Sequence, residues 1–249
     1  MNQCTITIED EVNCRIGGLK KEHLDYLWDK FGIMVDGARH MPSFQLRRWD
    51  GKIRFFDKYG NTFTKILNEI VPILCSFDYE IDIKDNRNPF VIIKERITED
   101  YFGNGFKLRP YQVDTVNKMV EATSGFGILA TGAGKTSIAA ALSMVLCSNG
   151  LQVLIIVPST DLVNQTITEF KERLSNFDIN IGEYSGQTKT IDNPIVVATW
   201  QSLQNAPHYM SYFSAVIVDE SHGVKAQVIK DLINVHGKHI AYRYGVTGT

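Results

Sequence analysis

Ala130-Thr131-Gly132-Ala133-Gly134-Lys135-Thr136 follows an apolar run, residues 126–129, and precedes Ser137, the first residue of a segment with helical composition. A strand, a loop that ends in Gly-Lys-Thr and a helix form, in this order, the phosphate-binding P-loop. The glycines let several backbone N–H groups turn toward one anion, and the helix N-terminus adds the positive end of its dipole. This order predicts that the seven residues from Thr131 to Ser137 bind a nucleotide.

Two side chains of the loop have defined chemistry. Lys135 can reach the β- and γ-phosphates, and the hydroxyl of Thr136 can ligate Mg²⁺. The general pattern has a glycine five positions before Gly134, where this chain has Leu129, so the first glycine of the loop is Gly132. The predicted cofactors are ATP and Mg²⁺.

A second motif is acidic and begins with Asp219 and Glu220. It follows an apolar run at residues 215–218, which is typical of a buried parallel strand. Carboxylates at the end of such a strand lie beside the P-loop in doubly wound sheets. Asp219 is predicted to hold Mg²⁺, and Glu220 to orient and activate the attacking water. The alternative for this stretch alone is a solvated acidic turn after a core strand.

The fold class is predicted from the alternation of elements after residue 107. Helical and extended segments follow one another there, which predicts an α/β fold with a parallel sheet covered on both faces. The expected strands are residues 127–130, 152–157, 179–184, 195–198, 215–218 and 240–246. The expected helices are residues 111–122, 135–147, 161–174 and 226–234.

The N-terminal part of the chain has a different pattern. Residues 4–8 alternate and could pair with residues 12–16 as a hairpin, and residues 19–31 and 64–77 have helical spacing. Residues 1–93 are therefore predicted to form a small α+β domain. The charged and glycine-broken residues 94–106 are expected to form a linker, and residues 107–249 the second domain.

A basic segment with interleaved aromatic residues lies within the first domain. Residues 39–65 contain seven Lys or Arg and two Asp, a local charge of +5 in a chain whose net charge is −2. Such a segment can hold phosphates and stack or wedge an aromatic ring. The alternative is a solvated basic face with Trp49 and Phe55 in the core.

The second domain resembles superfamily 2 helicases and translocases, whose motifs occur here in the family's order. The resemblance implies a RecA-like domain in which Arg109 and Gln112 belong to the adenine-reading segment. It further implies DNA-backbone contacts from Ser159, Thr160, Thr199, Trp200 and Gln201. Residues 219–222 resemble motif II and residues 247–249 motif III, so that His222, Thr247 and Thr249 are expected to couple hydrolysis to domain movement.

The first domain resembles the N-terminal domain of UvsW-type recombination helicases of tailed phages, on the pattern from Phe44 to Asp57. That resemblance implies a duplex-DNA-binding module that uses Arg47, Arg48, Trp49, Lys52 and Arg54. The implied activity is ATP-dependent unwinding and branch migration of branched DNA in recombination and fork repair, in the cytoplasm of a phage-infected bacterial host. The motor of a restriction-type or other duplex translocase is the alternative, because it shares the same motifs.

The chain ends within the segment that resembles motif III. The resemblance implies a second RecA-like domain that supplies arginine fingers, worth about 10³–10⁵ in rate in related NTPases. We therefore expect the N-terminal portion of a longer enzyme, which turns over ATP poorly by itself.

Composition narrows the remaining function classes. Apolar residues make up 44% and charged residues 22% of the 249 positions, which is typical of a folded protein. The N-terminus lacks the pattern of a signal peptide, and no apolar run is long enough for a membrane span. A DNA-binding protein without catalysis would need none of Lys135, Thr136, Asp219 and Glu220, which disfavours that class.

Overall fold

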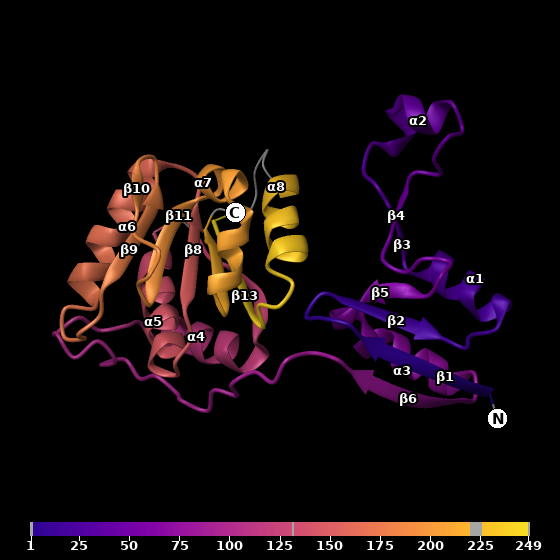
Figure 1. Cartoon of the computed structure of the whole chain (residues 1–249), viewed down its shortest axis with the longest axis horizontal. Helices are drawn as coiled ribbons and strands as arrows, with labels where there is room; N and C mark the ends of the chain where they lie inside the picture. Colours follow the sequence, from indigo (N-terminus) through magenta and orange to yellow (C-terminus); the bar gives the residue numbers. More distant parts are fainter. Residues whose placement is uncertain (1, 131, 220–225, 249) are drawn as a thin grey trace. The chain divides into compact units, whose positions relative to one another are not determined.

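The computed structural model describes residues 2–130, 132–219 and 226–248. The chain divides into two compact units, Met1–Asn88 and Pro89–Thr249, which are described separately below (Figure 1). The division lies before the predicted domain boundary at residue 93.

The N-terminal unit is built on a four-stranded sheet with the order β5-β2-β1-β6. Its strands are β1 (Asn2–Ile8), β2 (Asn13–Gly17), β5 (Asn61–Phe63) and β6 (Tyr79–Asp85). The predicted hairpin of β1 and β2 is confirmed, with Ile8 paired to Cys14. Its turn is closed by Asp10, whose Oδ1 accepts hydrogen bonds from the backbone N–H of Val12 and Asn13 at 2.8 and 2.7 Å.

Two helices, α1 (Lys21–Lys30) and α3 (Leu67–Ser76), complete the core of this unit. Every second residue of β1 is buried, which places one face of the strand against the core. Ile6 and Ile16 of the sheet share a buried cluster with Leu27 of α1 and with Ile70 and Leu74 of α3. The sheet is therefore covered by helices on the face that its alternating apolar residues mark.

An arm extends from this unit, and we define it as residues 32–54. β3 (Gly32–Met34) and β4 (Lys52–Arg54) pair antiparallel and form a separate two-stranded ladder. Between them lie a short 3₁₀ helix, η1 (Ala38–His40), and a single helical turn, α2 (Pro42–Gln45). Figure 1 shows β3 and β4 leading away from the sheet of their own unit, with α2 at the far end.

The second unit contains a seven-stranded sheet with the order β10-β9-β11-β8-β12-β13-β7. All neighbouring strands are parallel except β10 and β9, and this confirms the predicted α/β sheet. The strands are β7 (Ser124–Ile128), β8 (Val153–Val157), β9 (Ile181–Ser185), β10 (Thr188–Lys189), β11 (Ile195–Thr199), β12 (Ala215–Asp219) and β13 (Tyr242–Thr247).

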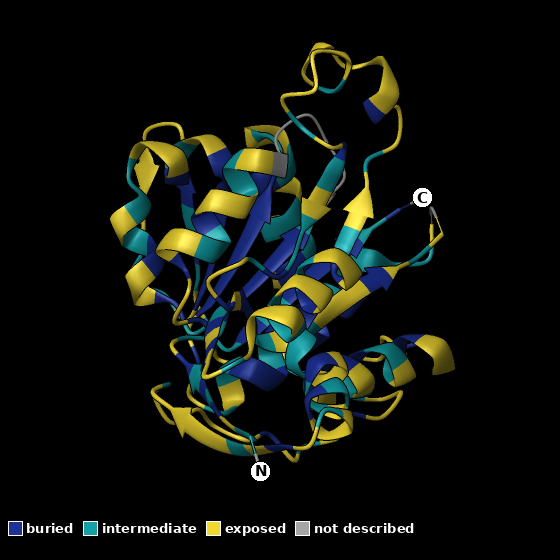
Figure 2. Ribbon diagram, turned by 90° about the vertical axis from the view of Figure 1, so that its right-hand side faces the viewer, coloured by how far each residue is buried: buried dark blue, intermediate teal, exposed yellow. Residues whose placement is uncertain are grey.

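Helices cover both faces of this sheet, and each face has its own core. Ile155 and Ile217 lie in one core with residues of α4, α5 and α6, whereas Leu154, Ile156 and Val216 lie in the other with residues of α7 and η4. The α-helices are α4 (Pro110–Ala122), α5 (Lys135–Ser148), α6 (Thr160–Arg173), α7 (Trp200–Asn205) and α8 (Ala226–Asp231). The shorter helices are the 3₁₀ turn η2 (Thr64–Ile66) of the first unit, η3 (Pro207–Tyr212) and the π-helix η4 (Leu232–His236). Figure 2 shows the central strands as buried between helices with exposed outer faces.

Residues 94–106, predicted as a linker, instead belong to the second unit. Ile97 is 4% exposed and Phe102 is fully buried in the same core as α4 and α5. The side-chain amide of Asn117 accepts from the backbone N–H of Ile97 at 2.9 Å and donates to its carbonyl at 3.2 Å. The apolar residues that anchor this segment are spaced among charges, and the charges alone suggested a solvated stretch.

Each helix in the described part of the chain is too short or too polar to span a lipid bilayer.

Candidate nucleotide site and basic arm

Three neighbouring parallel strands bring the P-loop and the motif II carboxylate to one edge of the sheet. β13 lies between β12 and β7, with Asp219 paired to Val246 and Ile128 paired to Thr247. The backbone N–H of Leu129 donates to the carbonyl of Thr247 at 3.0 Å, which extends the pairing into the start of the loop. With strands about 4.8 Å apart, Asp219 lies about two strand spacings from the loop.

The P-loop turns at two glycines in the left-handed region. Gly132 has φ 80° and Gly134 has φ 74°, and Gly134 is the N-cap of α5. A Cβ at Gly134 would lie 2.4 Å from Nε2 of Gln112, whereas a Cβ at Gly132 would meet nothing within 4 Å. The loop thus requires glycine at both positions for the backbone, and at Gly134 also for packing.

Side chains from the loop and from β12 converge at this edge. Lys135, Thr136 and Asp219 line a common cavity of about 20 Å³, closed below by core residues of β8, α6 and β12. That volume holds about one water molecule. The described residues include no cluster of three or more His, Cys, Asp or Glu side chains that could bind a metal by themselves. A Mg²⁺ bound largely by phosphate oxygens and water needs only one hydroxyl and one carboxylate, so Thr136 and Asp219 fit that ion.

Ser137, which was predicted to bind the nucleotide, points toward another helix. It is 2% exposed, and its Oγ accepts a hydrogen bond from Nε of Arg173 at 2.8 Å. Arg173, at the end of α6, also donates to the backbone carbonyl of Glu169 at 3.1 Å, and its guanidinium lies 5.3 Å from the centre of the Phe106 ring. Sequence reasoning missed Arg173, because no local pattern connects residues so distant along the chain.

Gln112 holds the P-loop in this structure. It is 3% exposed, its Nε2 donates to the carbonyl of Ala133 at 2.8 Å, and its Oε1 accepts from the backbone N–H of Arg109 at 2.8 Å. Tyr111, which the sequence analysis did not single out, donates through its hydroxyl to the same carbonyl at 2.7 Å. The exposed Arg109 donates to that hydroxyl at 3.1 Å. Both ends of the Gln112 amide are therefore occupied by protein groups.

The predicted DNA-contact residues of this unit divide into exposed and structural ones. Ser159 caps α6, and its Oγ accepts from the backbone N–H of Leu162 at 3.4 Å. Thr199 is 4% exposed and caps α7, and Trp200 is 9% exposed within a core cluster. Thr160 and Gln201 are exposed.

These residues follow β8 and β11, which are adjacent parallel strands with Thr199 paired to Val157. Nε2 of Gln201 donates to the carbonyl of Pro158 at 3.4 Å, which connects the two strand ends. They therefore lie at the same edge of the sheet as the P-loop. Thr247, from motif III, also lies at this edge, and its Oγ1 donates to the carbonyl of Gly248 at 3.0 Å.

Four of the predicted site residues lie outside the described residues: Thr131, Glu220, His222 and Thr249.

The two basic residues at the base of the arm are paired with acids. Nζ of Lys52 lies 2.7 Å from Oδ1 of Asp29, and Arg54 donates two hydrogen bonds to the carboxylate of Asp50, one of them at 3.0 Å. The guanidinium of Arg54 also lies 3.4 Å from the centre of the Trp28 ring. The hydrogen bonds from Arg54 lower the pKa of Asp50 to about 2, and the hydrogen bond from Lys52 lowers the pKa of Asp29.

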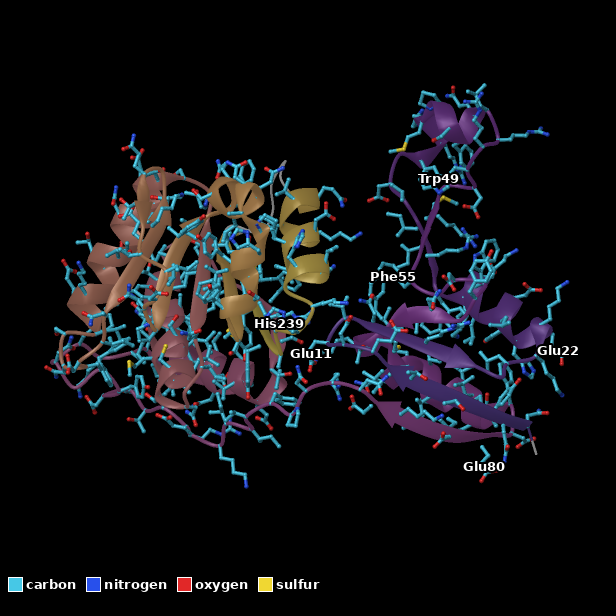
Figure 3. All side chains as sticks on the ribbon, in the orientation of Figure 1. Glu11, Glu22, Trp49, Phe55, Glu80 and His239 are labelled. Atoms are coloured by element: carbon cyan, nitrogen blue, oxygen red, sulfur yellow. The ribbon has the colours of Figure 1, made fainter. Side chains whose placement is uncertain are left out.

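Trp49 is half-buried and is held by a hydrogen bond. Its indole Nε1 donates to the carbonyl of Lys52 at 2.9 Å, and Figure 3 shows the residue on the arm. Phe55, also labelled there, is half-buried and packs against the core of its own unit. The structure thus separates the two aromatic residues that the alternative interpretation placed together in the core: Phe55 packs against that core, whereas Trp49 lies on the arm.

Arg47 and Arg48 lie at the end of the arm and are exposed. Neither forms an ion pair with any acid among the residues that the structure describes. Both lie along a cavity of about 720 Å³, together with Arg39, Phe44, Gln45, Trp49 and Asp50. Of the five predicted DNA-binding residues of this unit, only these two arginines present unpaired cations.

Comparison with known proteins finds relatives that cover most of the chain. The ATP-dependent DNA helicase uvsW of Enterobacteria phage T4 is 28% identical over 243 residues, which are 90% of this chain and 47% of the relative. The DNA 3'-5' helicase XPB of Kineococcus radiotolerans is 31% identical over 160 residues, which are 60% of this chain and 27% of that protein. The chain thus spans about half and about a quarter of the lengths of these two relatives.

A crystal structure of T4 UvsW matches 99% of this chain and 53% of its own, with 25% identity and a TM-score of 0.77. A second, of the UvsW helicase from bacteriophage T4, shows the same fold with 24% identity and a TM-score of 0.75, over 99% of this chain and 92% of that one. The predicted resemblance to UvsW-type superfamily 2 helicases is confirmed by these matches. The family model described as "Type III restriction enzyme, res subunit" matches residues 105–249, which is more than half of the chain, and the chain belongs to that family.

Proposed function

We propose that the chain contains the first RecA-like motor domain of an ATP-dependent DNA helicase, with ATP and Mg²⁺ as cofactors. The observation that carries this proposal is the convergence of Lys135 and Thr136, at the start of α5, with Asp219, at the end of β12. Lys135 would neutralise the β- and γ-phosphates, and Thr136 and Asp219 would hold the ion. The sequence assigns the water-activating role to Glu220.

The proposed track for DNA lies along the same edge of the sheet. Thr160 and Gln201 are exposed there, and helix α6 begins beside them. Helix N-termini and exposed hydroxyl and amide groups are common partners of nucleic-acid phosphates. Ser159 and Thr199 would serve by capping the helices that carry these contacts, and Trp200 by packing beneath them. Domain movement along the DNA would be coupled to ATP hydrolysis by His222, Thr247 and Thr249.

For the substrate of this motor, we propose branched DNA during recombination and fork repair, in the cytoplasm of a phage-infected bacterium. It is supported by the similarity to T4 uvsW, which covers both units of the chain and not the motor alone. A second RecA-like domain is the proposed partner, and the chain by itself is expected to hydrolyse ATP slowly and to separate no strands.

Phosphate release in saturating ATP and Mg²⁺, with and without four-way junction DNA, tests the motor proposal. We expect slow turnover by the chain, loss of that turnover in Lys135→Ala, and no change in Lys118→Ala. Lys118 is a suitable control because it is exposed on α4 and pairs with Asp114. Equal rates in the two variants would contradict the proposal.

The second candidate is the motor of a restriction-type duplex translocase, which the family match favours. A duplex translocase would be expected to displace a third strand from duplex DNA, whereas a branch remodeller would be expected to convert junctions into separated duplexes. Assaying both substrates with an enzyme that joins this chain to a second RecA-like domain distinguishes the two. Triplex displacement without junction processing would favour the translocase.

A further inference from the structure

The arm has a neutralised base and a cationic end. At the base, Lys52 and Arg54 are paired with Asp29 and Asp50, and Arg54 and Lys58 lie on the Trp28 ring at 3.4 and 4.4 Å from its centre. At the end, Arg39, Arg47 and Arg48 are exposed and form no ion pair with a described acid, and the neighbouring Asp50 is already paired with Arg54. The positive charge available to a ligand is therefore concentrated at the end of the arm.

The surface at that end is hollow, and we call it the arm basin. It has a volume of about 720 Å³ and is lined by three arginines, two aromatic residues, one amide and one paired carboxylate: Arg39, Arg47, Arg48, Phe44, Trp49, Gln45 and Asp50. This volume lies within the ~300–1,000 Å³ typical of sites for small organic ligands. Cations beside aromatic rings and an amide are the groups that bind a phosphate together with an unstacked base.

The basin is held in shape by bonds within the arm. The indole N–H of Trp49 is bonded to the carbonyl of Lys52 at 2.9 Å. The backbone N–H groups of Arg47 and Arg48 donate to the carbonyls of Phe44 and Ser43, both at 2.9 Å, and Arg47 has φ 54°. A site that is already ordered loses less entropy on binding.

We propose that the arm basin binds one or two unpaired nucleotides at a DNA branch point, with the arginines on phosphates and Phe44 against a base. This inference rests on the proposed function for DNA as the substrate, but not on the nucleotide site. In duplex DNA the bases stack on one another, so a hollow with aromatic walls favours the unpaired strand over the duplex. Leu46, which is 62% exposed beside Arg47, adds an apolar surface for the last base pair.

The test measures binding of the full chain to a blunt duplex and to the same duplex with a single-stranded flap, by fluorescence anisotropy at several salt concentrations. Phe44→Leu removes a ring, Arg47→Ala/Arg48→Ala removes two cations, and Lys21→Ala/Lys84→Ala removes two exposed cations of the same unit away from the arm. Circular dichroism checks that each variant is folded. 2-Aminopurine at the first flap nucleotide reports stacking directly.

We expect Phe44→Leu to weaken flap binding about tenfold, the effect of losing one stacked base, without changing the salt dependence. Arg47→Ala/Arg48→Ala should reduce the log–log salt slope for the flap by about 1.4, since each phosphate contact of a single strand contributes about 0.7. The lysine control should match the wild type, and 2-aminopurine quenching should be lost in Phe44→Leu.

Equal affinity of the wild type for flap and blunt duplex, with no effect of Phe44→Leu, would overturn the proposal and leave at most a duplex-backbone site. Unchanged DNA binding in all arm variants would also overturn it, because the basin would then contribute nothing to the affinity for DNA. Neither result would alter the phosphate-release test of Lys135, so failure of the basin and failure of the motor are distinguishable.

Discussion

Gly134 and Gln112 depend on each other at the start of α5. A methyl group at Gly134 would lie 2.4 Å from Nε2 of Gln112, whereas one at Gly132 would occupy open space. Gly132→Ala should therefore cost only the left-handed backbone penalty of about 1–2 kcal/mol, and Gly134→Ala should cost more. Urea unfolding measures both. Equal losses in the two variants, or a Gly134→Ala loss unaffected by Gln112→Ala, would show that this packing does not constrain the loop.

Asp50 makes the arm sensitive to acid. Its pKa is lowered to about 2 by the hydrogen bonds from Arg54, below the ordinary value near 4. A lowered pKa in the folded state means that the ion pair contributes fully above pH ~4 and is lost as the pH falls through about 2. Tryptophan fluorescence, which Trp28 and Trp49 make sensitive to the arm, should change over this window in the wild type. The acid-dependent change should disappear in Asp50→Asn, and an identical titration in that variant would contradict the assignment.

Single residues also show where sequence reasoning reached its limit. The P-loop could be predicted because its chemistry is local and its glycines are needed by a turn that the sequence itself specifies. The hydrogen bonds of Gln112 to Ala133 and of Ser137 to Arg173 could not be predicted, because they depend on how the helices pack in the folded domain. The same is true of Lys52 and Arg54, whose charges are visible in the sequence but whose pairing is not.

At the scale of elements, Arg173 connects α6 to α5. Arg173→Lys keeps a cation near Glu169 but removes the Nε–H that donates to Ser137, and Ser137→Ala removes the acceptor. Each change should lower the free energy of unfolding by about 1 kcal/mol, the typical net value of one hydrogen bond. The double variant should lose less than the two losses combined, because both act on the same bond. Urea denaturation followed by circular dichroism measures this, and strict additivity would contradict it.

Elements were predicted well where continuous apolar runs were bounded by polar residues. The buried strands β8, β11 and β12 lie close to the expected residues because parallel strands covered on both faces are apolar throughout. The arm was not predicted as a separate ladder, because β3 and β4 are three residues each and carry little periodic signal. Residues 94–106 were misjudged because their anchoring residues are few and lie among charges.

At the scale of the whole molecule, the two units have separate hydrophobic cores. Two cooperative units that do not share a core should unfold in two transitions during calorimetry. ATP with Mg²⁺ should raise only the transition of the second unit, because a ligand stabilises the unit that binds it. A single transition that shifts as a whole with nucleotide would show that the units fold as one.

The most direct test of the central claim is equilibrium binding of a fluorescent ATP analogue to the full chain in the presence of Mg²⁺. If the edge formed by β7, β13 and β12 is the nucleotide site, Lys135→Ala should weaken binding about tenfold or more, the effect of losing a charge-assisted hydrogen bond to phosphate. Lys118→Ala should bind as the wild type does, and removal of Mg²⁺ should weaken the wild type. Wild-type affinity in Lys135→Ala would contradict the account.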